Sequence, residues 1–195
     1  QYYTGQAFNI KALTEAAHSV GAYAGFDCAH AAGNINMELH DWNVDFAAWC
    51  TYKYMNSSPG GVSGIFVHNK HGENPETPRL AGWWGHKESE RFQMKKGFIP
   101  EPGAAGWQLS NAPVLAMAAH KASLDMFDEV GMDALVAKGK KLNAFLEQVV
   151  MDAQAANDKL EFTIITPEER GCQLSMLTNE NGKALFDYLT EHDVI

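Results

Sequence analysis

The chain has 195 residues, of which 46% are hydrophobic and 20% are charged, and its formal net charge is −9 at pH 7. This length and composition fit one folded domain, or a domain with part of a second, and they exclude general disorder. The negative charge argues against nucleic acid as a partner, because phosphate backbones are bound by clustered Lys and Arg. A single small phosphate group needs only a few local donors and is compatible with this charge.

The cysteines and the apolar runs indicate the compartment. Cys28, Cys50 and Cys172 are too few and too scattered for a disulfide framework, so we expect buried free thiols in a reducing, cytoplasmic setting. No apolar run approaches the roughly 20 residues that span a bilayer, so we expect no membrane partner. Because the chain opens on Gln1 within structured sequence and stops where an apolar strand would begin, we expect an internal fragment.

The first predicted helix covers residues 8–20, where apolar side chains recur at helical spacing and Gly21 ends the pattern. The strand-like run AYAGFD (22–27) follows and ends at Asp27. A helix, a short loop and a strand are half of an α/β crossover, in which strands are buried on both faces. Working residues of open α/β sheets lie at the carboxyl ends of strands, where we expect Asp27.

A second apolar run, residues 44–52, leads directly into Lys53. The glycine-rich loop NSSPGGVSG (56–64) and the strand-like run GIFVHN (64–69) come next. A strand, a glycine-rich turn and another strand indicate a hairpin. The sequence therefore predicts an α/β fold with a mainly parallel sheet and one antiparallel strand.

Periodicity disappears between about residues 70 and 112, although this stretch carries three of the five tryptophans. Loops this long are uncommon in compact domains and are usually either functional or disordered. Aromatic burial by Trp83, Trp84 and Trp107 favours an ordered segment at an active site or an interface.

Helical periodicity resumes after Pro113 over about residues 114–130 and again over 135–150. Two strand-like runs (160–166 and 172–178) and a short helix near 183–192 complete the chain. We expect residues 1–112 to be part of a large cofactor-binding domain. Residues 113–195 would form a connecting helix and the start of an α+β C-terminal domain.

Asp27 and Lys53 each follow a strand-like run and together suggest a specific chemistry. A lysine in a confined site forms an imine with a carbonyl group. Pyridoxal phosphate supplies such a carbonyl, and its ring accepts electrons only while the pyridine nitrogen is protonated, a state that a carboxylate stabilises. The pair therefore indicates a pyridoxal-phosphate site, although either residue alone is most simply a solvated side chain.

Nearby side chains leave two interpretations open. His30 either orients Asp27 or contacts the cofactor, or it is a buried histidine bonded to backbone. Tyr52 either serves a phosphate or a proton transfer, or it packs in the core. Trp83 and Trp84 are most simply core or interface aromatics. The histidines that we expect to be surface or incidental residues, with no metal-ligand pattern, are His18, His40, His68, His71 and His120.

Five long stretches carry a resemblance that is more specific than these spacings. They are YYTGQAFNI (2–10), GFDCAHAAGN (25–34), LHDWNVDFAAWCTYKYMNSSPGG (39–61), GWWGHKESERFQM (82–94) and WQLSNAP (107–113). In this order they resemble the kynureninases, fold-type-I pyridoxal-phosphate enzymes of tryptophan catabolism. The similarity covers essentially residues 1–130 and fades through the rest of the chain.

The resemblance implies a site built around pyridoxal 5′-phosphate. Lys53 would be the lysine that binds the cofactor covalently, and Asp27 would be the partner of the pyridine nitrogen. His30 would lie close to the cofactor. Tyr52 would contact the phosphate and is the nearest candidate to assist proton transfer.

The resemblance also implies roles for three residues farther along the chain. Trp83 would contact the phosphate, Asn111 would lie near cofactor or substrate, and His86 would face the aromatic ring of the substrate. Active sites of the family lie at a dimer interface, so Trp83 and Asn111 would serve the neighbouring subunit of a homodimer. The phosphate-binding loop, the ring-stacking residue and the arginine that clamps the substrate carboxylate would lie outside residues 1–195, so this fragment alone would turn over little or nothing.

The implied reaction is hydrolysis of L-kynurenine or its 3-hydroxy form to anthranilate, or the hydroxy analogue, and L-alanine, in the pathway that leads to NAD. The closest rival is another fold-type-I enzyme, a cysteine desulfurase or an aminotransferase. Desulfurases resemble one another in a Gln and a His at the positions held here by His30 and Tyr52. A second rival is a catalytically inactive homologue that acts as a binding module.

Overall fold

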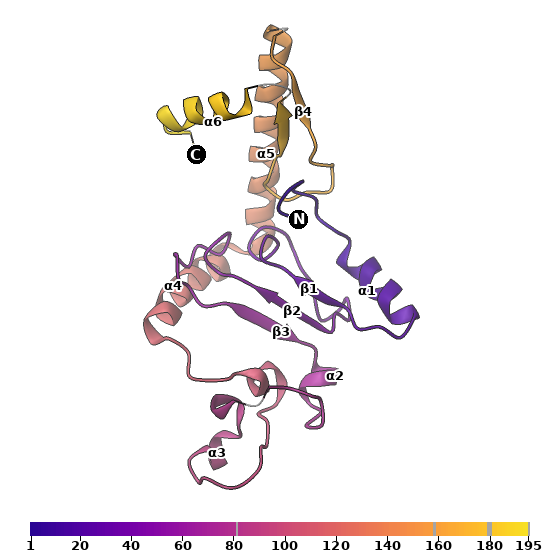
Figure 1. The fold of residues 1–195 in the computed structure, drawn as a ribbon, viewed down its shortest axis with the longest axis vertical. Helices are drawn as coiled ribbons and strands as arrows, with labels where there is room; N and C mark the ends of the chain where they lie inside the picture. Colours follow the sequence, from indigo (N-terminus) through magenta and orange to yellow (C-terminus); the bar gives the residue numbers. More distant parts are fainter. Residues whose placement is uncertain (81, 158, 179–180, 195) are drawn as a thin grey trace. The chain divides into compact units, whose positions relative to one another are not determined.

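The structure is a computed structural model that describes residues 1–80, 82–157, 159–178 and 181–194 (Figure 1). The chain forms two compact units, one of Asn9–Met132 and one of Gln1–Phe8 with Asp133–Ile195. Compactness within this chain does not define a domain of a longer protein. The predicted division into residues 1–112 and 113–195 therefore stays a prediction.

The unit Asn9–Met132 is built on a three-stranded mixed sheet. Its strands are β1 (Gly25–Asp27), β2 (Phe46–Trp49) and β3 (Gly64–Val67), in that spatial order. β1 pairs with β2 in parallel and β2 pairs with β3 antiparallel. The prediction of an α/β fold with one antiparallel strand is confirmed.

Helix α1 (Ile10–Ser19) precedes β1. Asn9 starts the helix, because its side-chain oxygen accepts the backbone N–H of Ala12 at 3.0 Å. Gly21 follows the helix with a φ of +76°, a left-handed conformation that residues with a Cβ adopt at a cost. The predicted helix over residues 8–20 is therefore confirmed, with each end two residues or less from its expected place.

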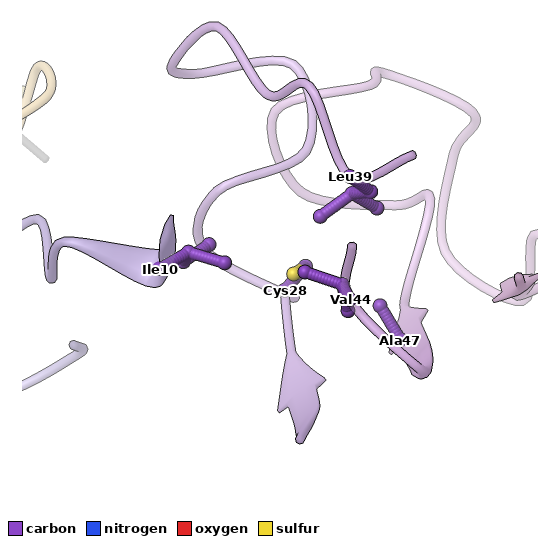
Figure 2. Packing of buried hydrophobic residues seen from close by; sticks show 5 residues of the cluster. All are labelled: Ile10, Cys28, Leu39, Val44 and Ala47. Atoms are coloured by element: carbon purple, nitrogen blue, oxygen red, sulfur yellow. The ribbon is translucent and has the colours of Figure 1, made fainter. Parts of the chain in front are cut away.

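The hydrophobic core of this unit is a cluster of five buried side chains that lie close to one another (Figure 2). Phe26, Trp49 and Phe66 pack against the core from the strands. Full burial of one aliphatic side chain stabilises a fold by about 1.5–3 kcal/mol. The buried residues that form the core cluster are Ile10, Cys28, Leu39, Val44 and Ala47.

The opposite face of the sheet is open in this chain. Side chains alternate along a strand, so the neighbours of Phe26 and Ala47 point the other way. Asp27, Phe46, Ala48 and Ile65 are all exposed on that side. The expectation that these strands are buried on both faces is therefore wrong for this chain. We call this surface the open face.

The tryptophan-rich stretch folds into α2 (Asn69–Gly72), η1 (Trp83–Gly85), α3 (Glu88–Arg91) and η2 (Gly103–Trp107). Two arginines organise it by lying over indole rings, Arg79 at 3.9 Å from the Trp107 ring centre and Arg91 at 4.3 Å from that of Trp84. Buried Arg91 also donates to the carbonyl of Trp84 at 2.8 Å. Cation–π and hydrogen-bond contacts therefore order this segment, although its sequence has no helical or strand periodicity.

Two long helices and a small hairpin make up the rest. α4 (Val114–Val130) is the last helix of the unit Asn9–Met132, and α5 (Met132–Ala156) belongs to the other unit from Asp133 on. The second unit also holds β4 (Phe162–Ile164), β5 (Met176–Thr178) and α6 (Gly182–Glu191), with β4 and β5 antiparallel. Each predicted element is present, but both strands are shorter than the seven-residue runs that predicted them.

Two further expectations can be compared with the structure. Within the described ranges, no helix combines the length and apolar content needed to cross a bilayer. Cys28 is buried, but Cys50 is only half-buried and Cys172 is exposed. The expectation of three buried thiols is therefore wrong for the last two.

Candidate active site

Asp27 is the last residue of β1 and lies on the open face beside Ala48 of β2. Its Oδ1 accepts the backbone N–H of Ala29 at 2.9 Å, which fixes the carboxylate in a local turn. Within the described parts of the chain, Oδ2 has no hydrogen-bond donor. The carboxylate is thus oriented by the backbone while one oxygen stays available to a ligand.

The segment of Lys53 lies directly beside that of Asp27. The backbone N–H of Cys28 donates to the carbonyl of Ala48 at 2.8 Å and continues the parallel ladder. The rings of His30 and Tyr54 meet edge to face with centroids 6.0 Å apart. The turns after β1 and β2 therefore pack together and bring the residues around Asp27 next to those around Lys53.

Gly33 makes this close packing possible. Its φ is +81°, and a Cβ at this position would lie 2.8 Å from the carbonyl oxygen of Tyr54. Contacts under about 3 Å between such atoms force something to shift, so any larger residue would displace one turn or the other. The turn after β1 is shaped to receive the backbone next to Lys53.

Residues 51–62, which we call the lysine loop, are held by buried polar groups. The N–H of Ser57 donates to the carbonyl of Thr51 at 3.0 Å, and Thr51 Oγ1 donates to the carbonyl of Val62. Thr51 and Ser57 are almost completely buried. Buried hydroxyls that satisfy backbone groups rigidify a loop, because losing a partner leaves a desolvated polar atom. Half-buried Lys53 is therefore presented on a fixed support.

Helix α4 supplies two more contacts to the lysine loop. His120 Nδ1 lies 2.6 Å from Ser57 Oγ, and Ser123 Oγ donates to the carbonyl of Met55. The expectation that His120 is incidental is wrong. The sequence signal, two polar side chains three positions apart on one helix, was present, but it does not reveal the partner.

Tyr52 is 51% exposed, so it is not the core residue that one interpretation allowed. The ammonium of Lys53 lies 5.8 Å from the centre of its ring, within the range of a cation–π contact. The phenol and the amine are therefore neighbours on the accessible side of the loop.

Trp83 and His86 line the same pocket, and their hydrogen bonds among the described residues do not involve Lys53. The indole N–H of Trp83 donates to the carbonyl of Arg91 at 3.2 Å, and His86 Nδ1 accepts the N–H of Ile99 at 3.0 Å. Both line a pocket of about 460 Å³ together with Arg91. Because Nδ1 of His86 is an acceptor, its Nε2 carries the ring proton in the neutral form.

Asn111 is exposed, and its Oδ1 accepts the hydroxyl of Ser110 at 3.1 Å. No hydrogen bond, ion pair or ring contact among the described residues joins Asn111, Trp83 or His86 to the lysine loop. The structure thus brings Asp27, His30, Tyr52 and Lys53 into one region. The roles of all seven predicted site residues stay predictions.

The amino end of β2 holds a cluster that the sequence did not predict. The Asp45 carboxylate is only 2% exposed and accepts His18 Nε2 at 2.8 Å, His71 Nε2 at 2.7 Å and the N–H of Ala24 at 2.6 Å. Lys70 Nζ lies 2.7 Å from Oδ1. The expectation that His18 and His71 are incidental is therefore wrong.

These partners determine the charge state of Asp45. Burial alone would raise its pKa, but the hydrogen bonds from His71, Lys70, Ala24 and His18 outweigh burial and hold the pKa well below its ordinary value. With both oxygens occupied by protein donors, Asp45 is an anchor that joins α1, β2 and α2.

Comparison with known proteins places this geometry in a family. The family model described as aminotransferase class-V matches residues 2–178. A kynureninase of Flavobacterium johnsoniae is 54% identical over the whole chain, and one of Xanthomonas campestris is 49% identical over the whole chain. The chain spans 46% of the length of each of these relatives. The resemblance to kynureninases is thus confirmed and extends beyond the expected residues 1–130.

Solved structures agree on the fold. The cysteine desulfurase CsdA of Escherichia coli superposes with a TM-score of 0.73 at 17% identity, covering 98% of this chain and 45% of that one. The cystine C-S lyase C-DES gives a TM-score of 0.76 at 16% identity, covering 99% of this chain and 50% of that one. Such low identities show a shared fold alone. The match over residues 2–178 shows that this chain belongs to the aminotransferase class-V family.

Proposed function

We propose that the intact protein is a kynureninase. It would hydrolyse the bond between Cβ and Cγ of L-kynurenine, or of 3-hydroxy-L-kynurenine, to give anthranilate or 3-hydroxyanthranilate and L-alanine. The observation that carries this proposal is the identity of about half of all residues, along the entire chain, to kynureninases of several bacteria. The neighbouring turns that carry Asp27 and Lys53 support it.

The residues present fit pyridoxal 5′-phosphate. That group supplies an aldehyde that binds an amine and a protonated pyridine ring that accepts electrons from the substrate. Lys53 offers the amine on a rigid loop, and Asp27 offers an oriented carboxylate whose Oδ2 has no donor among the described residues. The open face beside Asp27 carries only the small side chain of Ala48 at that register, which leaves room for a flat ring.

The side chains around Lys53 suggest how the reaction proceeds. Lys53 would hold the cofactor through its amine, and the same amine would serve as the base that takes the proton from the substrate Cα. Asp27 would keep the pyridine nitrogen protonated through a charge-assisted hydrogen bond. Exposed Tyr52, next to the Lys53 amine, is the nearest additional group to deliver or remove a proton. One water is consumed, and its oxygen ends in the carboxylate of the aromatic product.

The remaining predicted residues fit a shared site. We propose that His30 lies against the cofactor, that Trp83 contacts the phosphate, and that His86 and Asn111 face cofactor or substrate. The bonds of Trp83 and His86 among the described residues do not involve the lysine loop, and we propose a homodimer in which this segment of one subunit serves the other's cofactor. We further propose a cytoplasmic enzyme of tryptophan catabolism, upstream of NAD formation, that acts on a small molecule and binds neither nucleic acid nor membrane.

The test compares Lys53→Ala with the unaltered intact protein, each supplied with pyridoxal 5′-phosphate. We expect the unaltered protein to release anthranilate from L-kynurenine and to release no sulfur product from L-cysteine. Lys53→Ala should lose the visible absorbance of bound cofactor and at least about 1000-fold of turnover, because no other amine can take its place. A variant that keeps both, or a protein that prefers cysteine, contradicts the proposal.

A further inference from the structure

Two side chains of α4 reach the lysine loop from one helical face. Residues three apart on a helix are neighbours, and His120 and Ser123 point to the same turn. His120 Nδ1 lies 2.6 Å from Ser57 Oγ, and Ser123 Oγ donates to the carbonyl of Met55. The two residues that α4 contacts, Ser57 and Met55, lie four and two positions after Lys53.

The turn that receives these contacts requires outside support. Asn56 and Ser58 have φ values of +54° and +67°, which are costly for residues with a side chain. Ser57, between them, is 1% exposed, and Ser123 is 3% exposed. A strained turn persists where buried partners fix it, and here α4 provides two of those partners.

We propose that His120 and Ser123 are positioning residues for Lys53. They set the place of the Lys53 amine relative to Asp27 by clamping the turn of residues 55–58 against α4. The inference rests on the proposed role of Lys53, and it concerns the rate of the chemical step. Misplacement of a reacting group by about 1 Å can lower a rate by about 100-fold, whereas substrate binding depends on other contacts.

The bonds of His120 and Ser123 to the lysine loop can be removed or kept by single substitutions. Asn places an amide near the position of a histidine Nδ1, so His120→Asn can keep the bond to Ser57, and His120→Ala removes it. Ser123→Ala removes the donor to the Met55 carbonyl without touching the histidine. Lys121→Ala is the matched control, because exposed Lys121 lies on the same helix and, among the described residues, its side chain bonds only to Asp125, at 2.7 Å.

The experiment uses the intact protein with pyridoxal 5′-phosphate bound. Reduction with borohydride followed by mass spectrometry counts the sites in which Lys53 carries the cofactor, and kcat is expressed per such site. We expect His120→Ala to lower kcat by about 10-fold with KM changed by less than about 2-fold, and Ser123→Ala to have a smaller effect in the same direction. His120→Asn should recover most of the loss, and Lys121→Ala should match the unaltered protein.

A merely structural role predicts a different pattern. Fewer trapped sites and a lower Tm, with unchanged kcat at each remaining site, would overturn the inference while leaving the proposed function intact. If His120→Ala does not fold, the kcat per site of Ser123→Ala decides, because an unchanged value there overturns the inference. Borohydride trapping of cofactor at a residue other than Lys53 would instead refute the proposed function itself.

Discussion

Asp27 and Asp45 lie at opposite ends of two neighbouring parallel strands and show how the same carboxylate serves two purposes. Asp45 immediately precedes β2 and is almost fully buried, with both oxygens bound by protein donors. Asp27 ends β1 on the open face and accepts one backbone N–H. Because both oxygens of Asp45 accept hydrogen bonds from the protein, this residue holds the fold together. Asp27 uses one oxygen in this way, and the other can bind a ligand.

The physical reason for the difference is desolvation. A buried carboxylate destabilises a fold by several kcal/mol unless charges and hydrogen bonds compensate it, and this demand recruits His18, Lys70 and His71 around Asp45. An exposed carboxylate stays hydrated and needs no such partners, and among the described residues Asp27 bonds only to the backbone N–H of Ala29. Four predictions test this division of roles between the two ends.

The largest expected effect is that of Asp27→Asn on catalysis. An amide cannot hold a proton on the pyridine nitrogen, so kcat of the intact enzyme should fall by about 100-fold or more. The free energy of unfolding should remain within about 0.5 kcal/mol, because Asp27 is exposed. Steady-state kinetics and urea unfolding measure the two quantities. Equal losses of activity and stability would contradict the contrast with Asp45.

Asp45→Asn should show the opposite pattern. The amide leaves Lys70 without its buried counter-charge and places an N–H₂ group against donors, so we expect a loss of about 2–4 kcal/mol in the free energy of unfolding. Urea unfolding gives the value. Asp41→Asn is the matched control, since that carboxylate is 79% exposed and pairs only with His40 within the part of the chain that the structure describes. The free energy of unfolding of this variant should not change measurably.

Acid should destabilise the protein partly through Asp45. Its folded pKa lies below the ordinary value of 3.8, so the unfolded state binds the proton more readily. The stabilisation is present above about pH 5 and is lost as the pH falls through 3.8 toward the folded pKa. Urea unfolding between pH 6 and pH 3 should show a steeper loss for the unaltered protein than for Asp45→Asn. Parallel curves would exclude Asp45 as the source.

The smallest expected effect concerns Cys28, which follows Asp27 but points into the core. Burial, and to a lesser extent the charge of Asp27, raises the pKa of its thiol to about 11. Because the thiolate is the reactive form, Cys28 should resist alkylation at pH 8 while exposed Cys172 reacts. Mass spectrometry of the labelled peptides follows both. Rapid labelling of Cys28 in folded protein would show that the two faces of β1 do not differ as described.

Local patterns predicted much of this arrangement. The end of β1 was identified because Asp27 stops an apolar run, and the antiparallel β3 follows from the glycines between residues 60 and 64. The run over residues 44–52 overestimated β2, which ends at Trp49, so Lys53 lies in the loop after the strand and not at the strand's end. Helices α4 and α5 follow from apolar periodicity. The pairing of Asp27 with Lys53 rested on chemistry and on the resemblance to kynureninases.

The supporting contacts could not be predicted, for a physical reason. The bonds from His120 to Ser57 and from His71 to Asp45 join residues far apart in sequence, and no periodicity encodes them. A histidine near the surface and a histidine on a buried carboxylate have the same local sequence signal. The open face of the sheet was also missed, because an apolar strand does not reveal what covers it.

The close contact at Gly33 has a consequence for how this protein can change over time. The carbonyl of Tyr54 occupies the space where a side chain at position 33 would extend, so a methyl group added at one turn acts on the other. The turn after β1 and the lysine loop therefore cannot change independently of each other. Any lineage that replaces this glycine must also reshape the lysine loop, and a hydrogen atom at residue 33 thus constrains the backbone that carries Lys53.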